Sequence, residues 1–265
     1  MGKEMNRERK KYGGRISKAV CDFVYPGSLY CIGCGALIDR SRHYSLCNSC
    51  LSKFHFASGR TCEKCGKILE EGYYKAICRD CTVHEKKFER GYSCMLYGLY
   101  EKKILRDFKY SGKSYYAPYL GELMYDRVAH LLENEIGVDI VVPVPLHRKK
   151  QNKRGYNQAE LLAREISKRS GIPMKKVLVR TKNTRPMSSL TGAERRENLT
   201  GVFAVRPRQS SEIANNRILL IDDIYTTGST ANACSETLKS AGASAVIVLC
   251  LAAGGNGGSE DYLKN

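Results

Sequence analysis

Two adjacent carboxylates, Asp222 and Asp223, stand just before a turn that is rich in hydroxyl groups. The residues of this turn are Thr226, Thr227, Gly228, Ser229 and Thr230. They open a predicted helix, and the first backbone N–H groups of a helix favour an anion. Carboxylates do not bind phosphate, but they accept hydrogen bonds from sugar hydroxyls or help to hold magnesium. The combination predicts a sugar phosphate as the ligand.

The residues on either side of the turn predict the elements that position it. The run Ile218 to Ile221 is wholly apolar, which is typical of a parallel strand buried on both faces. Such sheets bind ligands beyond the carboxyl ends of their strands. After the turn, Ala231 and Leu238 follow helical spacing, and Gly242 ends the helix. The alternative is an ordinary connection in which Asp and Thr only cap a helix, although a cap needs one such residue.

This order of apolar residues, two acids and a Thr-Gly-rich loop resembles the signature of type I phosphoribosyltransferases, which bind 5-phosphoribosyl-1-pyrophosphate (PRPP). The resemblance implies that Asp222 and Asp223 hold the ribose hydroxyls. It implies that residues 226–230 hold the 5′-phosphate, and that magnesium is bound together with PRPP.

Two further stretches carry positive charge. Five basic side chains follow an expected strand at 139–145: Arg148, Lys149, Lys150, Lys153 and Arg154. They suit a pyrophosphate, because the loop expected to carry them stays open to a ligand, and the alternative is a basic loop that is only solvated. The stretch from Arg180 to Phe203 contains Arg195 and Arg196, and it is long and poor in core residues. The resemblance implies a mobile hood over PRPP here, and a surface hairpin with a charged face is the alternative.

Eight of the 12 cysteines form two copies of the pattern Cys-x2-Cys-x12-Cys-x2-Cys. They are Cys31, Cys34, Cys47 and Cys50 in the first copy, and Cys62, Cys65, Cys78 and Cys81 in the second. Each cysteine of the first copy has its counterpart in the second copy 31 residues later, which indicates an internal duplication. Four thiolates suit tetrahedral zinc, so two structural zinc ions are expected. Duplication favours one ion for each copy, but the spacing also allows an interleaved pairing.

From residue 86 onward, apolar strand patterns and helical patterns alternate. The expected strands lie within 88–100, 139–145, 177–179, 218–221 and 245–251, and the expected helices lie around 120–132, at 158–170 and after Gly228. This alternation predicts an α/β fold, with a mainly parallel sheet flanked by helices, preceded by a small zinc-stabilised domain. The expected parts are a basic segment 1–25, a zinc-binding region 26–85, a phosphoribosyltransferase-like domain 86–253 and a flexible tail 254–265.

The cysteine repeat, the phosphate signature and four further motifs together resemble the ComF (competence protein F) family. The further motifs are Lys109-Tyr110-x-Gly112, Pro143-x-Pro145-Leu146, Arg154-Gly155-Tyr156-Asn157-Gln158 and Arg195-x2-Asn198. The resemblance implies a zinc-bearing cytoplasmic protein that handles single-stranded DNA during natural transformation, with partners in the DNA-uptake machinery. The expected activity is phosphoribosyl transfer to an unknown acceptor. A non-catalytic single-stranded DNA adaptor and a PRPP-responsive regulator are the alternatives.

The charge balance is consistent with a nucleic-acid partner. The formal net charge is +17, and eight thiolates with two Zn²⁺ ions would lower it to about +13. A chain this basic attracts polyanions in a salt-dependent way. No apolar signal peptide or membrane span is recognised in the sequence, so a cytoplasmic location is expected.

Overall fold

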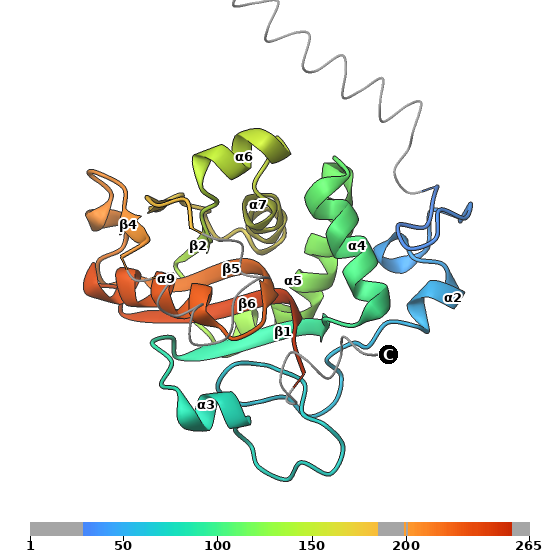
Figure 1. The fold of residues 1–265 in the computed structure, drawn as a ribbon, viewed down its shortest axis with the longest axis horizontal. Helices are drawn as coiled ribbons and strands as arrows, with labels where there is room; N and C mark the ends of the chain where they lie inside the picture. Colours follow the sequence, from blue (N-terminus) through green and yellow to red (C-terminus); the bar gives the residue numbers. More distant parts are fainter. Residues whose placement is uncertain (1–28, 185–198, 200, 256–265) are drawn as a thin grey trace, which may run out of the picture. The chain divides into compact units, whose positions relative to one another are not determined.

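The computed structural model describes residues 29–184, 199 and 201–255. The chain divides into two compact units, Met1–Ser52 and Lys53–Asn265. The first unit contains the first cysteine copy, a bridge between Tyr30 and Leu37, the 3-10 helix η1 (His43–Ser45) and the short helix α2 (Asn48–Leu51). The second unit contains the second cysteine copy and all strands of the main sheet (Figure 1).

The main sheet has four parallel strands in the order β1-β6-β5-β2. They are β1 (Arg90–Leu96), β6 (Ala245–Ala253), β5 (Arg217–Tyr225) and β2 (Ile140–Pro143). All nine residues of β6 are buried, and so is the apolar run Ile218 to Ile221 of β5. Because the strands are parallel, their carboxyl ends meet at one edge, where the acids of β5 lie.

Three helices pack on this sheet: α5 (Ala117–Asn134), α7 (Gln158–Ser170) and α9 (Ser229–Ser240). The second unit also contains α4 (Leu99–Tyr110) and the shorter α3 (Arg79–Val83), α6 (Arg148–Arg154), η2 (Ser114–Tyr116) and η4 (Ser210–Glu212). Helices α5 and α7 contact each other closely, because a Cβ at Gly121 would lie 2.3 Å from the Cβ of Glu165. Helix α9 contacts β5 and β6, and its residues Ala231 and Leu238 share a buried cluster with Cys62 of the second cysteine copy.

The predicted fold class is confirmed: a parallel sheet flanked by helices follows two four-cysteine clusters. Helix α7 has the predicted bounds, since Asn157 caps its start and Gly171 takes the left-handed conformation at its end. The expected strand at 177–179 is β3 (Leu178–Arg180), which pairs antiparallel with β4 (Phe203–Val205) outside the main sheet. The boundaries of the four predicted parts stay a prediction.

Two local predictions were wrong. Strand or hairpin structure was expected as far as residue 100, but helix α4 begins at Leu99, because Ile104, Leu105 and Phe108 form a buried helical face. The basic stretch 148–154 was expected to be an open loop, but it forms helix α6. The His147 ring caps this helix by accepting from the Lys149 N–H at 3.3 Å, and Gly155 ends it with a φ of 84°.

Candidate functional site

The two acids lie where β5 extends past its neighbour β2. Ile221 pairs with Pro143, the last residue of β2, so Asp222 and Asp223 stand just beyond that strand. The Nζ of Lys109, in the last turn of α4, lies 2.9 Å from Oδ2 of Asp223, and both side chains are largely buried. Lys109 therefore fixes the second acid at this edge of the sheet.

Asp222 is an unusual carboxyl group. Burial and the negative charge of Asp223 raise its pKa from 3.8 to about 7, although the Asp223 N–H donates to Asp222 Oδ1 at 2.8 Å and opposes the shift. The positive charges of Lys109 and Arg180 also oppose it. Its surroundings therefore favour the protonated form of Asp222, and a ligand that donates hydrogen bonds to it or adds positive charge would favour the carboxylate form.

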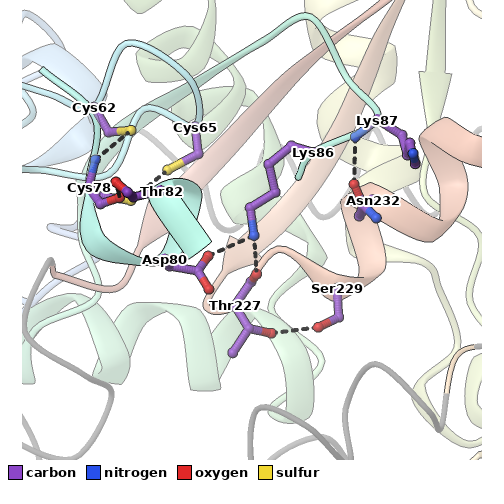
Figure 2. Close-up of polar contacts among 10 residues, drawn as sticks. All are labelled: Cys62, Cys65, Cys78, Asp80, Thr82, Lys86, Lys87, Thr227, Ser229 and Asn232. Carbon is purple, nitrogen blue, oxygen red and sulfur yellow. Dashed lines mark hydrogen bonds and ion pairs between the residues drawn. The ribbon is translucent and has the colours of Figure 1, made fainter. Parts of the chain in front are cut away.

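The turn after β5 has the geometry of an anion cradle. Gly228 takes a left-handed conformation with a φ of 72° and stands at the N-cap of α9, where no side chain caps the helix. The backbone N–H groups of the first turn are thus available for a ligand. The hydroxyls of Thr227 and Ser229 lie 2.8 Å apart, so both side chains sit at this helix end (Figure 2).

A side chain at position 228 should damage this turn. A Cβ there would lie 2.1 Å from the hydroxyl of Tyr225, which is buried, and the positive φ disfavours any L-residue. We expect Gly228→Ala to lower the free energy of unfolding by about 1 to 3 kcal/mol. Chemical denaturation checks this, with Gly137→Ala as the control, because a Cβ at Gly137 would meet nothing within 4 Å. Equal losses of the free energy of unfolding in the two variants would contradict a special requirement for glycine at position 228.

The basic candidates occupy different places on α6. Arg148, Lys149 and Lys153 are exposed. The Nζ of Lys150 donates to the backbone oxygen of Thr184 at 3.4 Å, and burial together with the charges of Arg180 and Arg154 lowers the pKa of Lys150. Lys150 therefore lies at the base of the predicted hood, whereas the three exposed cations face solvent.

The fifth basic candidate, Arg154, is held by two side chains. Its guanidinium lies 4.6 Å from the ring centroid of Tyr110, donates to the Tyr110 hydroxyl at 2.9 Å and donates to Gln158 Oε1 at 3.1 Å. The hood candidates Arg195 and Arg196 lie outside the described residues. The roles of all seven basic candidates stay predictions.

Two residues without a predicted role belong to this site. Lys109 pairs with Asp223, and Arg180, in β3, is close enough to influence the pKa of Asp222. Burial lowers the pKa of Arg180, and its Nε is buried with no hydrogen-bond partner among the described residues. Lys109 and Asp223 are far apart in the sequence, and so are Arg180 and Asp222, so no local spacing indicates either pair.

The cysteines form two separate clusters, one for each copy, so the interleaved pairing is wrong. Within each cluster the four sulfur atoms all lie within 4.8 Å of one another. The sulfurs of Cys34 and Cys47 are 3.8 Å apart, and those of Cys65 and Cys78 are 3.7 Å apart. Tetrahedral zinc with bonds of about 2.3 Å requires sulfur separations of about 3.8 Å. Both clusters therefore fit a structural zinc ion.

Backbone N–H groups support the sulfurs in the same way in both copies. The N–H of Cys47 donates to the sulfur of Cys31 at 3.3 Å, and the N–H of Cys78 donates to the sulfur of Cys62 at 3.2 Å. Such bonds favour thiolates, the form that binds metal.

In the described part of the chain, none of the helices has both the length and the apolar character that a membrane crossing needs.

Two domain families match the sequence. The double zinc ribbon domain matches residues 20–82, and the phosphoribosyl transferase domain matches residues 121–264, which is more than half of the 265 residues. The matches place a zinc-binding region before a phosphoribosyl transferase domain, as the sequence predicted.

Several curated proteins are similar to the chain. Competence protein F of Haemophilus influenzae is 32% identical over 155 residues, which cover 56% of this chain and 66% of that protein. DNA utilization protein YhgH of Escherichia coli is 30% identical over 152 residues, covering 56% and 65%. Competence protein ComFC of Bacillus subtilis is 32% identical over 108 residues, covering 41% of each. The chain thus spans just under two thirds of the first two relatives.

Solved structures show a looser likeness. Adenine phosphoribosyltransferase from Saccharomyces cerevisiae matches with a TM-score of 0.32 and 19% identity over 50% of this chain and 68% of that one. A hypoxanthine phosphoribosyltransferase from Staphylococcus aureus matches with a TM-score of 0.33 and 17% identity, covering 51% and 62%.

Proposed function

Because the chain belongs to the phosphoribosyl transferase domain family, in the ComF combination with a double zinc ribbon, we propose that it binds magnesium PRPP or a related sugar phosphate. The observation that carries this proposal is the pair Asp222 and Asp223 beside an uncapped helix N-terminus. The acids accept hydrogen bonds from the two ribose hydroxyls, and residues 226–230 hold the 5′-phosphate.

The remaining charges suit the other end of PRPP. Lys150 and Arg154 of α6, together with the exposed cations of that helix, would neutralise the pyrophosphate. Asp222 and Asp223 would help to hold a magnesium ion bound with it, and that ion would add to the neutralisation. We assign the protein a phosphoribosyltransferase activity with an unidentified acceptor. Displacement of pyrophosphate from the ribose C1 builds positive charge at that carbon, and the negative groups around it can stabilise this charge.

Calorimetric titration of the zinc-loaded protein with PRPP, with and without magnesium, tests the proposal. We expect saturable binding that is stronger with magnesium, because the ion offsets the repulsion between the pyrophosphate and the two acids. No binding under either condition would overturn the sugar-phosphate site. Binding with no pyrophosphate release on any acceptor would favour the PRPP-responsive regulator.

A role in handling single-stranded DNA in the cytosol, during DNA uptake, is the second part of the proposal. The supporting observation is the exposed Tyr110, which is 67% accessible, lies next to Lys109 and stacks with Arg154. Aromatic side chains beside cations can stack bases, and the net charge of +17 attracts the phosphates. Handling DNA without phosphoribosyl transfer, as an adaptor with partners in the uptake machinery, stays an alternative.

Binding of a labelled oligothymidylate, followed by fluorescence anisotropy, tests this part. We expect Tyr110→Ala to weaken oligothymidylate binding by about 1 to 3 kcal/mol. The affinity of the wild type and of the variant should fall steeply between about 50 and 200 mM salt. Tyr74→Ala is the matched control, because Tyr74 is also exposed and lies in the loop of the second cysteine copy. Equal affinity of the two variants would remove Tyr110 from the DNA site.

A further inference from the structure

We propose that the second cysteine copy is a part of the phosphate site, because Asp80 and Lys86 connect it to the loop that would hold the 5′-phosphate. Lys86 is then a positioning residue. The metal of this copy holds residues 226–230 in place indirectly, through Asp80 and Lys86. The identity of the ligand rests on the function proposed above, but the connection itself is a feature of the fold.

The connection begins on helix α3, which carries both a cysteine ligand and a carboxylate. Cys81 and Asp80 are neighbours on this helix. Oδ2 of Asp80 lies 2.7 Å from the Nζ of Lys86, and the same Nζ donates to the backbone oxygen of Thr227 at 3.4 Å (Figure 2). One ammonium group therefore joins the cysteine copy to the residue before Gly228.

Lys86 is buried to an extent that is rare for lysine. Its side chain is only 4% accessible. Burying an ammonium group is costly unless it is paired and hydrogen-bonded, and a residue needed only for packing would be apolar. Lys86 also lines a cavity of about 200 Å³, together with Thr227, Gly228 and Ser229. Its position is therefore explained by the loop that it contacts.

A second contact holds the start of helix α9. The backbone N–H of Lys87 donates to Oδ1 of Asn232 at 2.6 Å (Figure 2), and Asn232 lies in the first turn of that helix. Two consecutive residues, Lys86 and Lys87, thus hold both sides of Gly228. The loop cannot move away from the second cysteine copy without breaking one of these contacts.

The other side of the second copy is fixed to strand β1. The N–H of Gly91 donates to the backbone oxygen of Lys64 at 2.9 Å, and Oγ of Ser93 donates to that of Gly66 at 2.5 Å. A Cβ at Gly66 would lie 2.6 Å from the oxygen of Gly91, so the two backbones are in direct contact. The copy is therefore held between the sheet and the loop, and it can transmit a fixed position from one to the other.

The first experiment uses Lys86→Met, which removes the ammonium but keeps the apolar stem. We expect two zinc ions per chain, as in the wild type. Amide hydrogen exchange of residues 226–230 should become roughly tenfold faster, and PRPP affinity should fall roughly tenfold. The matched control is Lys87→Met, because Lys87 acts through its backbone and its side chain is 40% accessible. Wild-type exchange in Lys86→Met would overturn the proposal.

A second pair of variants tests the metal itself. Cys81→Ser and Cys34→Ser should each lose one zinc ion, but only Cys81→Ser should speed the exchange of residues 226–230. Equal exchange in both would overturn the proposal. If Cys81→Ser does not fold, Asp80→Asn tests the same connection with both ions in place. If the wild type does not bind PRPP, the proposed function fails, whereas the exchange measurements still decide whether the connection exists.

Discussion

The Asp222→Asn/Asp223→Asn variant is expected to lose measurable binding of magnesium PRPP while it remains folded. Asparagine keeps the shape of each side chain but removes the negative charge that makes its hydrogen bonds strong. Two charge-assisted bonds to ribose hydroxyls contribute about 3 to 6 kcal/mol, so the affinity should fall roughly a hundredfold to ten-thousandfold. Titration calorimetry of the variant beside the wild type measures this loss.

The control for this variant is Asp126→Asn, because Asp126 is an exposed acid on α5. It should bind PRPP like the wild type. Phosphoribosyl transfer or PRPP binding that survives in the double variant would show that the ligand uses another site.

The raised pKa of Asp222 makes both the stability of the protein and its PRPP affinity depend on pH. The folded protein holds a proton on Asp222 up to a pKa of about 7, above the ordinary 3.8. The free energy of unfolding therefore falls as the pH rises from 3.8 to about 7, and the loss is complete above that. Above pH 7, Asp222→Asn should be at least as stable as the wild type.

The PRPP affinity of the wild type should rise between about pH 6 and 8, as the carboxylate of Asp222 forms. The PRPP affinity of Asp222→Asn should not rise in this way.

The local part of the site could be predicted from the sequence. The acids, the turn and the start of α9 are consecutive, so strand pattern, glycine and hydroxyl residues indicate them together. The contacts that complete the site are not local. Lys109 meets Asp223, and Lys86 meets Thr227, across more than 100 residues, and their partners depend on which helix packs on which strand. No spacing in one sequence carries that information.

The two cysteine copies illustrate the same limit. Gly35 and Gly66 occupy the same position in the repeat, and both have a positive φ, 78° and 74°. A Cβ at Gly35 would meet nothing within 4 Å, whereas one at Gly66 would meet the backbone of β1. The duplicated pattern predicts two equal metal sites, but only the second belongs to the unit that contains the sheet. This difference depends on packing and cannot be read from the cysteine spacing.

Removal of zinc should therefore proceed in two distinct steps. In the first copy only Cys31 is buried, and Cys34 is exposed, whereas three of the four cysteines in the second copy are buried. A chelator should reach the first ion sooner, because ligand exchange needs access to the sulfurs. We expect one fast and one slow equivalent of zinc, measured with a metallochromic dye.

The fast step should unfold the region around the first ion. Helix α2 has four residues, none of them buried, and helices this short do not persist alone in water. A structural zinc ion contributes about 10 to 16 kcal/mol of binding free energy, which such a small core cannot replace. Amide exchange of residues 29–52 should become fast when the first equivalent leaves, while β1, β5 and β6 stay protected. Cys34→Ser should lack the fast equivalent, and release of both ions in a single phase from the wild type would contradict the difference between the copies. Release in a single phase would mean that both clusters lose their ions together. The different burial of their cysteines, and their places in different units, argue against this.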